Sequence, residues 1–386
     1  MSGIGQLSCP RESEPHALTV AGVIERFAPA YWERYGRRIP LDQRKALQAI
    51  LQCRTPALGG HRYACGCGHE HHAFHSCNHR LCPRCGSADT QVWVRKQLGK
   101  LLPVPYYLVT FTLPSELRPV MLGNRQAMEL LMSCSARALN ELLADPARGC
   151  SFEHAGFFGV YQSWTQEMRF HPHVHYVVPA VGLDDRWKLK HPKSPKFLLH
   201  AQPLANRLRT LLANALHAQG LIRKELFWKL VKTNWNADLE RAGNGENAIK
   251  YLGQYIRRSV ISGHRILGVE GDLVRIRIKN RDTGDYECRS LDGVEFVRRF
   301  LLHALPERFH RIRYRGFLHA RGKARLQWLQ LLLEARLQPT PKPKSEPIPE
   351  REILCPRCGC PMRKIKKMPR APPAHRGEHF LYAVAA

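Results

Sequence analysis

The sequence predicts an α+β fold, in which helices and strands follow one another irregularly along the chain. The chain has 386 residues, of which 44% are hydrophobic, so it is long enough for two or three domains that each bury a core. Segments with apolar residues at helical spacing are interspersed with segments rich in β-branched and aromatic residues. Cysteine and histidine are concentrated in short stretches near the two ends of the chain, which indicates small modules beside a larger central region.

Helices are expected where apolar residues recur every three or four positions. The longest pattern of this kind is Arg125–Leu143, and another follows the turn signal Asn244-Gly245 and runs from Glu246 to Arg258. The remaining expected helices are Val20–Tyr35, Leu41–Leu51, Thr90–Leu102, Leu204–Leu216, Ile222–Val231 and Val294–Leu305.

Strands are expected where β-branched and aromatic residues cluster or alternate with polar ones. Pro105–Leu113 has the density of a buried strand, and Gly156–Trp164 and His173–Val181 read as two strands joined by a short polar link. Leu273–Ile278 alternates apolar and basic residues, as a half-buried strand does.

The charge balance indicates a polyanionic partner. Lys and Arg number 60 against 32 Asp and Glu, a formal net charge of +28, and an excess of this size is typical of proteins that bind nucleic acid. The alternative is an ordinary solvated basic surface. No run reaches the roughly 18 apolar residues of a membrane span, and no segment resembles a signal peptide, so we expect a cytoplasmic protein without a membrane partner.

Five of the 13 cysteines lie between Cys65 and Cys85. The spacing Cys-x-x-Cys-Gly at Cys82 and Cys85 is that of a zinc knuckle, in which two thiolates converge on one ion. We expect the Cys65/Cys67 pair to complete this structural zinc site, and the basic module to contact DNA; a redox pair, free buried thiols or a purely structural knuckle are the alternatives. The expected zinc ligands are Cys65, Cys67, Cys77, Cys82 and Cys85, and Cys53, His61 and nearby histidines are donors for another ion.

Two histidines lie two residues apart in the expected strand His173–Val181. Residues i and i+2 of a strand point to the same side, so the imidazoles of His173 and His175 share one face and could hold a divalent ion. The alternative is a pair of core histidines satisfied by hydrogen bonds.

Two tyrosines lie four residues apart in the expected helix Glu246–Arg258. Residues i and i+4 share a helix face, so the phenols of Tyr251 and Tyr255 lie one turn apart. Arg257 and Arg258 follow, which suits a site that handles phosphates. The alternative is an aromatic stripe that packs on a sheet.

In this order, the cysteine module, the His-hydrophobic-His motif and the Tyr-x-x-x-Tyr motif resemble the rolling-circle insertion-sequence transposases of the insertion sequence ninety-one type. These belong to the two-tyrosine HUH endonuclease superfamily, and the resemblance covers roughly residues 20–320. The chain departs from the family in the shortened Cys65-x-Cys67 pair and in the tail beyond Gln338. The family-like stretches are Cys53–His61, Ser76–Cys85, Tyr106–Pro114, Phe170–Pro179, Tyr251–Ile266 and Phe296–Leu318.

The resemblance implies a ferredoxin-like HUH nuclease domain, an antiparallel sheet with helices packed on it. The strand Tyr107–Thr112 would lie centrally beside the histidine strand, and the tyrosine helix would face the metal. The protein would be bacterial, and associated with the nucleoid when bound to DNA.

The resemblance also implies a chemistry. His173 and His175 would hold Mg²⁺ or Mn²⁺, with Gln162 or Gln166 as the third ligand, and a tyrosine would attack single-stranded DNA to form a 5′-phosphotyrosine and release a 3′-hydroxyl. The covalent link conserves the phosphodiester energy, so no nucleotide cofactor is expected, and no phosphate-binding loop motif occurs in the sequence. We expect Arg257, Arg258, Arg311 and Arg313 to bind DNA.

The C-terminal region contains a second cysteine motif, Cys355-x-x-Cys358-Gly-Cys360, which resembles half of a zinc ribbon. His375 and His379 could complete a two-Cys two-His site with Cys355 and Cys358; a disordered basic tail is the alternative. The expected regions are an N-terminal helical and zinc-binding domain (1–100), a nuclease domain (101–336), a Pro/Lys linker (337–352) and a basic tail with this module (353–386).

Three functional hypotheses follow from these motifs. The leading one is an enzyme, a rolling-circle transposase that cleaves and rejoins single-stranded DNA at the ends of a mobile element. The second is a plasmid replication initiator or relaxase with the same chemistry. The third is a zinc-dependent DNA-binding regulator without catalysis, which leaves the histidine pair and the tyrosines without a role.

Overall fold

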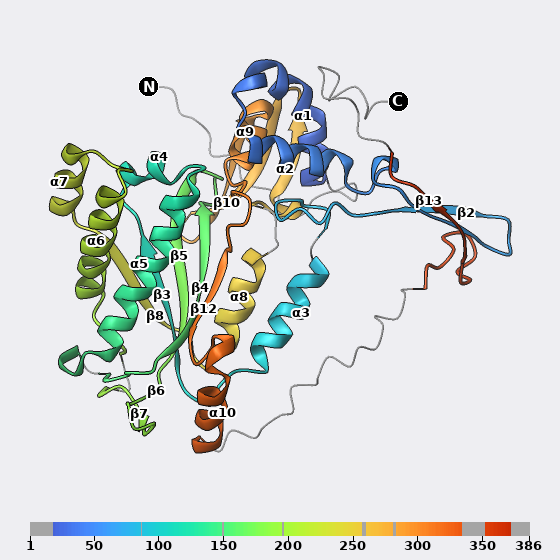
Figure 1. Ribbon diagram of the computed structural model, residues 1–386. Coiled ribbons are helices and arrows are strands. Elements are labelled where there is room, and N and C mark those ends of the chain that lie inside the picture. The colour runs from blue at the N-terminus through green and yellow to red at the C-terminus, as the bar shows by residue number, and fades with distance from the viewer. Residues whose placement is uncertain are drawn as a thin grey trace.

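The computed structural model describes residues 18–85, 87–148, 150–194, 197–256, 260–280, 283–333 and 352–371. Its centre is a five-stranded antiparallel sheet with the strand order β12–β4–β5–β3–β8 (Figure 1). The first four of these strands along the chain, β3, β4, β5 and β8, are arranged side by side in the order 4-1-3-2 of a ferredoxin-like fold, and the fifth, β12, is added at the edge next to β4. These strands are β3 (Tyr106–Thr112), β4 (Gly156–Trp164), β5 (Phe170–Pro179), β8 (Asn236–Arg241) and β12 (Ile312–Gly316).

Helices α5 (Arg125–Ala144), α6 (Ala201–Ala218) and α7 (Lys224–Lys232) cover one face of this sheet (Figure 1). The hydroxyl of Tyr176, which is buried from β5 beneath α5, lies 2.7 Å from the Ser135 hydroxyl. Gly159 on β4 is required here, because a Cβ at that position would lie 2.4 Å from the Tyr176 ring. A short helix, α4 (Arg118–Met121), precedes α5.

Helices α3 (Ser87–Leu98), α8 (Glu246–Ile256) and α10 (Lys323–Leu332) lie on the opposite face (Figure 1). Along β5, Val174 and Tyr176 belong to the core under α5, whereas Val177 belongs to the core under α8. By this alternation His173 and His175 point to the side of α8. The strand expected at Tyr107–Thr112 is β3, which lies inside the sheet and pairs with the histidine strand β5. Thr110 is opposite His175 in this pairing.

A second core joins the N-terminal helices to residues between 260 and 304. Helices α1 (Val20–Tyr35) and α2 (Leu41–Gln52) pack with α9 (Gly293–Leu301) and a three-stranded sheet. This core extends from residue 20 to residue 304, so packing does not follow the division that we expected near residue 100. The sheet consists of β9 (Ile266–Glu270), β10 (Leu273–Lys279) and β11 (Tyr286–Asp292), of which the sequence predicted only β10.

A three-stranded ribbon projects from the body of the molecule (Figure 1). Its middle strand, β1 (Gly60–Ala64), pairs with β2 (Glu70–Phe74) on one side and with β13 (Arg363–Met368) on the other. The C-terminal region that we expected to form a module of its own therefore completes the N-terminal one. A minor pair, β6 (Gly182–Leu183) and β7 (Leu189–Lys190), accompanies the main sheet.

Three expectations fall partly or wholly outside the described residues: the linker, His375 with His379, and Arg257 with Arg258. Within the described ranges, no helix is long and apolar enough to cross a membrane. The α+β class is confirmed, and the expected strands of the central region occur in the expected order, but β8 and β12 of the main sheet were not expected from the sequence.

Candidate functional site

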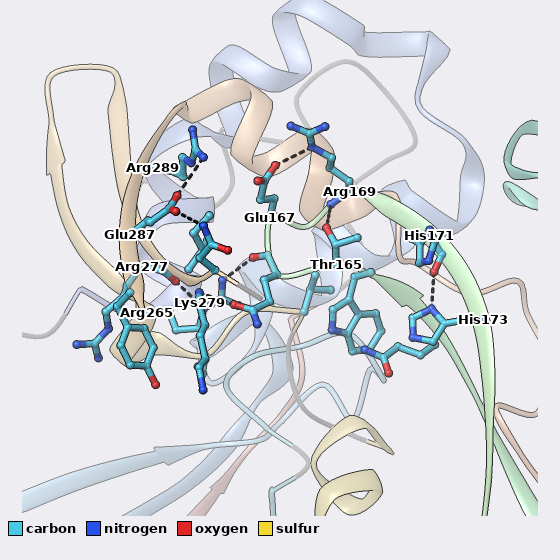
Figure 2. Close-up of a pocket in the computed structure, with 18 of the residues that line it drawn as sticks. Thr165, Glu167, Arg169, His171, His173, Arg265, Arg277, Lys279, Glu287 and Arg289 are labelled. Atoms are coloured by element: carbon cyan, nitrogen blue, oxygen red, sulfur yellow. Dashed lines mark hydrogen bonds and ion pairs between the residues drawn. The ribbon is translucent and has the colours of Figure 1, made fainter. Parts of the chain in front are cut away.

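A cleft of about 1160 Å³ lies where the main sheet meets the β9–β10–β11 sheet (Figure 2). Its floor includes His173 and His175 from β5 and Gln162 from β4, and Tyr251 of α8 also lines it. Residues of the β4–β5 turn and of β10 and β11 form the other wall. The cleft therefore brings both predicted motifs, the histidine pair and the tyrosine helix, to one place.

The backbone and a neighbouring strand orient the two imidazoles. The Nδ1–H of His173 donates to the carbonyl oxygen of His171 at 2.6 Å, which leaves the lone pair on Nε2. Nδ1 of His175 lies 2.8 Å from the Thr110 hydroxyl, which can accept in the same way. The rings are 4.8 Å apart and both side chains are more than 90% buried. Metal-binding histidines are typically held by such contacts at the nitrogen that does not bind the ion.

The structure separates the two glutamines that we considered as third ligands. The Gln162 Oε1 lies 3.1 Å from Nε2 of His175. When an octahedral ion binds its ligands at about 2.1 Å, neighbouring ligand atoms lie about 3 Å from each other, so this separation matches that of two ligand atoms. The Gln166 Oε1 instead accepts a hydrogen bond from the backbone N–H of Lys279 at 2.6 Å. Gln162 thus faces the histidine pair, whereas Gln166 ties the β4–β5 turn to β10.

Tyr251 reaches the histidines from α8. Its ring centroid lies 6.2 Å from that of His175, edge to face, and 40% of the residue remains exposed. Ala248, Ile249 and Leu252 hold the helix against the sheet from its buried side. The backbone of Tyr255 lies in the same helix, one turn further along, and its side chain is outside the described set.

The cleft carries an excess of positive charge. Its two carboxylates are each paired with an arginine, Glu167 with Arg169 at 2.7 Å and Glu287 with Arg289 at 3.0 Å (Figure 2). Arg265 is fixed by the carbonyl oxygens of Arg277, at 2.8 Å, and of Gln166. Among the residues that the structure describes, six basic ones against two acidic ones line the cleft: Arg118, Arg169, Arg265, Arg277, Lys279 and Arg289 against Glu167 and Glu287.

Arg311 and Arg313 do not form the DNA-binding surface that we expected. Arg311 is 6% exposed, its guanidinium lies over the Trp164 ring at 5.4 Å, and burial lowers its pKa to about 10. Arg313 is paired with Glu129 of α5. Both arginines lie within or beside the edge strand β12, and their guanidinium groups contact the protein itself, Trp164 and Glu129.

Sequence reasoning missed His171, Arg118 and the arginines of the β9–β10–β11 sheet. His171 lies two residues before His173, so the same i, i+2 pattern would have placed it on the cleft side. The guanidinium of Arg118 donates a hydrogen bond to Nδ1 of His171 at 3.2 Å. No local signal marks Arg265 or Arg277, since they reach the cleft only through packing of the second sheet on the first.

The cysteines form two groups of four, and the grouping differs from the expected one. The first group joins Cys77, Cys82 and Cys85 to Cys53, with Sγ atoms within 4.8 Å of one another. A hydrogen bond with Cys82 lowers the pKa of Cys77 to about 5, which favours the thiolate, the form that binds metal. Cys53 and Cys82 are fully buried in the second core. This group has the composition of a structural zinc site.

The second group contains Cys65, Cys67, Cys355 and Cys358, again with Sγ atoms within 4.8 Å. The expectation that Cys65 and Cys67 share an ion with Cys82 and Cys85 is therefore wrong, because the β1–β2 hairpin carries the first pair away along the ribbon. Among the described residues, no histidine belongs to either group.

His303 ties the wall of the cleft to α9. Its Nδ1 lies 3.1 Å from the Ser163 hydroxyl and its Nε2 3.1 Å from the carbonyl oxygen of Met168, on either side of the β4–β5 turn. The residue is 1% exposed, and burial lowers its pKa to about 3. The neutral imidazole is thus a structural link between the second core and the cleft.

This link predicts that acid weakens the fold. The unfolded chain takes up a proton at this histidine near its ordinary pKa of about 6.5, whereas the folded protein does so only near 3, so stability is present above about pH 6.5 and falls as the pH decreases toward 3. Between pH 6.5 and 5 we expect a loss of about 2 kcal/mol from this group. Denaturant unfolding of the wild type and of His303→Gln at several pH values measures it. An equal pH dependence in both would contradict the assignment.

The chain matches two known family profiles. Residues 23–113 match the family described as "Transposase zinc-binding domain", and residues 156–325 match that described as "Putative transposase". The first range contains Cys53 to Cys85, and the second contains the histidines and both tyrosines.

Two curated proteins are similar over most of their length. A protein of Sinorhizobium fredii named "Putative transposase y4qJ" is 36% identical over 321 residues, which cover 78% of this chain and 80% of the relative. The transposase for insertion sequence element IS801 of Pseudomonas savastanoi pv. phaseolicola is 30% identical over 317 residues, 76% of this chain and 74% of the relative. No solved structure matches the chain significantly.

Proposed function

This chain belongs to the transposases of the insertion sequence ninety-one type, and from that premise we propose that it cleaves and rejoins single-stranded DNA at the ends of a mobile element through tyrosine–DNA intermediates. The observation that carries the proposal is the approach of Tyr251 to the paired imidazoles of His173 and His175 inside a basic cleft. Family membership favours transposition over plasmid replication, and the cleft favours an enzyme over a regulator.

The cleft supplies the contacts that a single strand needs. Guanidinium groups of Arg265 and Arg277 and the ammonium of Lys279 line the wall opposite the histidines, where they can bind successive phosphates. The Tyr286 ring, which lies under Arg277 at 5.4 Å and is largely exposed, offers a surface on which a base can stack.

The donor set fits a divalent cation. His173 and His175 would hold it through Nε2 and Gln162 through Oε1, since these atoms face one side of β5 and β4. Mg²⁺ or Mn²⁺ held there would polarise the scissile phosphate and offset the charge that develops on it. Thr110 and the carbonyl oxygen of His171 keep the rings in the required orientation.

In this proposal Tyr251 is the attacking group. Its hydroxyl loses a proton as its oxygen bonds to phosphorus, the bond from phosphorus to the 3′ oxygen breaks, and the leaving 3′ oxygen takes up a proton, so the exchange is balanced. The phosphodiester becomes a phosphotyrosine ester of similar energy, so the strand can be rejoined without nucleotide hydrolysis. Tyr255, about 6 Å further along the helix, would perform the second cleavage that strand exchange requires.

Zinc serves the structure of this protein. The zinc-binding domain contains the Cys53, Cys77, Cys82 and Cys85 group, which follows α2 and belongs to the same core as Trp164 and Met168. By fixing the end of α2 against the core that bears Trp164 and Met168, the ion would help to hold the wall of the cleft.

The test of the proposed function is covalent capture. The full-length protein is incubated with 5′-labelled and 3′-labelled single strands that carry an end of its element, with Mg²⁺ or Mn²⁺, and then denatured. Only the strand labelled on the 3′ side of the cut should remain attached to the protein, and a duplex of the same sequence should react far less. Free cleavage products without a covalent adduct would contradict the proposal.

The threonine beside His175 provides a finer prediction. Thr110→Val keeps the shape of the side chain and removes the hydroxyl 2.8 Å from Nδ1 of His175. Loss of such an outer contact typically weakens metal binding by about 10-fold to 100-fold. The Mg²⁺ concentration for half-maximal cleavage should rise by that factor while cleavage at saturating Mg²⁺ changes little. An unchanged Mg²⁺ requirement would show that Thr110 does not orient this ring.

A further inference from the structure

The second group of cysteines joins parts of the chain that are nearly 300 residues apart. Cys65 and Cys67 lie in the turn between β1 and β2, and Cys355 and Cys358 lie in the loop before β13. The Sγ atoms of Cys65 and Cys358 are 3.4 Å apart, and those of Cys67 and Cys355 are 3.7 Å apart. Thiolates around a tetrahedral zinc ion at about 2.3 Å lie about 3.8 Å from each other, whereas a disulfide brings sulfurs to about 2.05 Å.

Each pair lies on a tight turn of the kind that presents two sulfurs to one ion. The N–H of Gly68 donates to the carbonyl oxygen of Cys65 at 3.0 Å, and that of Gly359 to Cys355 at 2.8 Å. Both glycines directly follow the second cysteine of their pair, and both have positive φ, 80° and 72°. The two halves thus form facing knuckles, one from each end of the chain.

Within the described part of the chain, the ribbon has little core to hold it together without an ion. Its buried cluster there consists of Cys65, Cys355 and Met362, with Tyr63 and Ile353 packed against them. In register, Arg62 of β1 lies opposite Lys366 of β13, and the Arg62 guanidinium is paired with Glu70 of β2, so this cross-strand position contributes no attraction between β1 and β13. A domain this small is stabilised by metal when its core is insufficient.

The outer strand of the ribbon is strongly basic. Arg363, Lys364, Lys366 and Lys367 on β13 are all exposed. Residues 352–371 contain six basic side chains and one acidic one. Figure 1 shows this ribbon projecting away from the sheet that carries the cleft, so its charges lie outside the proposed cleavage site.

We propose that a second structural zinc ion, bound by Cys65, Cys67, Cys355 and Cys358, fastens the C-terminal segment to the N-terminal hairpin and thereby builds a basic arm that binds the phosphate backbone of duplex DNA outside the cleft. The matched zinc-binding domain ends at residue 113, so it does not contain the two C-terminal ligands. The metal site stands on the sulfur geometry alone, and the DNA contact rests on the proposed function.

Zinc content tests the site without any DNA. Full-length protein purified without chelators should contain two zinc ions per chain, and Co²⁺ substitution should give thiolate-to-metal absorption equivalent to two four-cysteine sites. The variant with Cys355→Ser and Cys358→Ser should contain one ion. The matched control is Cys360→Ser, because Cys360 is near the loop but does not belong to the group, and it should retain two. One zinc ion in the wild type, or two in the double variant, would overturn the site.

Salt-dependent binding tests the arm. With a short duplex, the variant with Lys364→Gln and Lys366→Gln should bind more weakly, and the slope of log affinity against log salt should decrease by up to about 2. The charge-matched control changes Lys224 and Lys232 to Gln on α7, on the other side of the main sheet, and should leave the slope near the wild-type value. A wild-type slope in the ribbon variant, or equal decreases in both variants, would overturn the DNA contact. The outcome is separable from the proposed function, because covalent capture of a single strand is measured independently.

Discussion

The variant with Tyr251→Phe and Tyr255→Phe is expected to form no covalent protein–DNA product. The substitutions remove two hydroxyl oxygens and keep both rings, so α8 should still pack through Ala248, Ile249 and Leu252. Removing a nucleophile that forms a covalent intermediate costs at least about 10³-fold in rate. The adduct is measured on denaturing gels, and retention of single-strand binding shows that the fold is intact.

The single variants should separate the two tyrosines. Because Tyr251 lies beside His175, Tyr251→Phe should abolish the first cleavage, whereas Tyr255→Phe should still form an adduct and fail in strand transfer. Tyr35→Phe, at the end of α1 in the second core, is the matched control and should behave as wild type. An adduct of wild-type yield in the double variant would show that neither phenol is the nucleophile.

Loss of either cleft imidazole is the second change with a large expected effect. His173→Ala and His175→Ala each remove one nitrogen ligand and leave the sheet intact, so cleavage at ordinary Mg²⁺ concentrations should decrease by at least about 10²-fold. Thermal unfolding should change less than for a core residue, because both rings line the cleft. His191→Ala, in an exposed loop, is the control.

Metal addition distinguishes a ligand from a structural histidine. Chelation of the wild type should stop cleavage, and Mg²⁺ or Mn²⁺ should restore it, whereas the alanine variants should need far higher concentrations or not recover. If either variant cleaved at the wild-type rate at the same Mg²⁺ concentration, that histidine would not be a metal ligand and would be a core residue satisfied by hydrogen bonds.

Local sequence patterns predicted the parts of the site that lie on single elements. The alternation along β5 placed His173 and His175 on one face, and the helical pattern placed Tyr251 and the backbone of Tyr255 in α8. The choice between Gln162 and Gln166 needed the strand register, since Gln162 lies opposite His173 and Gln166 falls in the turn. Sequence alone does not give that register when a bulge lies between the strands, as it does here.

Contacts between distant segments were not predictable from spacing. The cysteine groups followed neither of the expected pairings, because β13 returns to β1 and carries Cys355 and Cys358 with it. Arg311 has the sequence context of a DNA-binding arginine, yet the packing of Trp164 buries it. Burial of a basic residue and the meeting of the two chain ends are both decided by tertiary packing.

The chemistry proposed for the cleft can be read from the covalent product itself. After reaction with a short single strand that carries an end of its element, the protein is digested with nuclease and protease, and the peptide that retains nucleotide mass is sequenced by mass spectrometry. We predict a 5′-phosphate-linked nucleotide on the peptide of residues 246–256, attached to Tyr251 in the wild type. A nucleotide on a peptide from any other element, or a fully cleaved strand with no modified peptide, would contradict the proposed tyrosine chemistry.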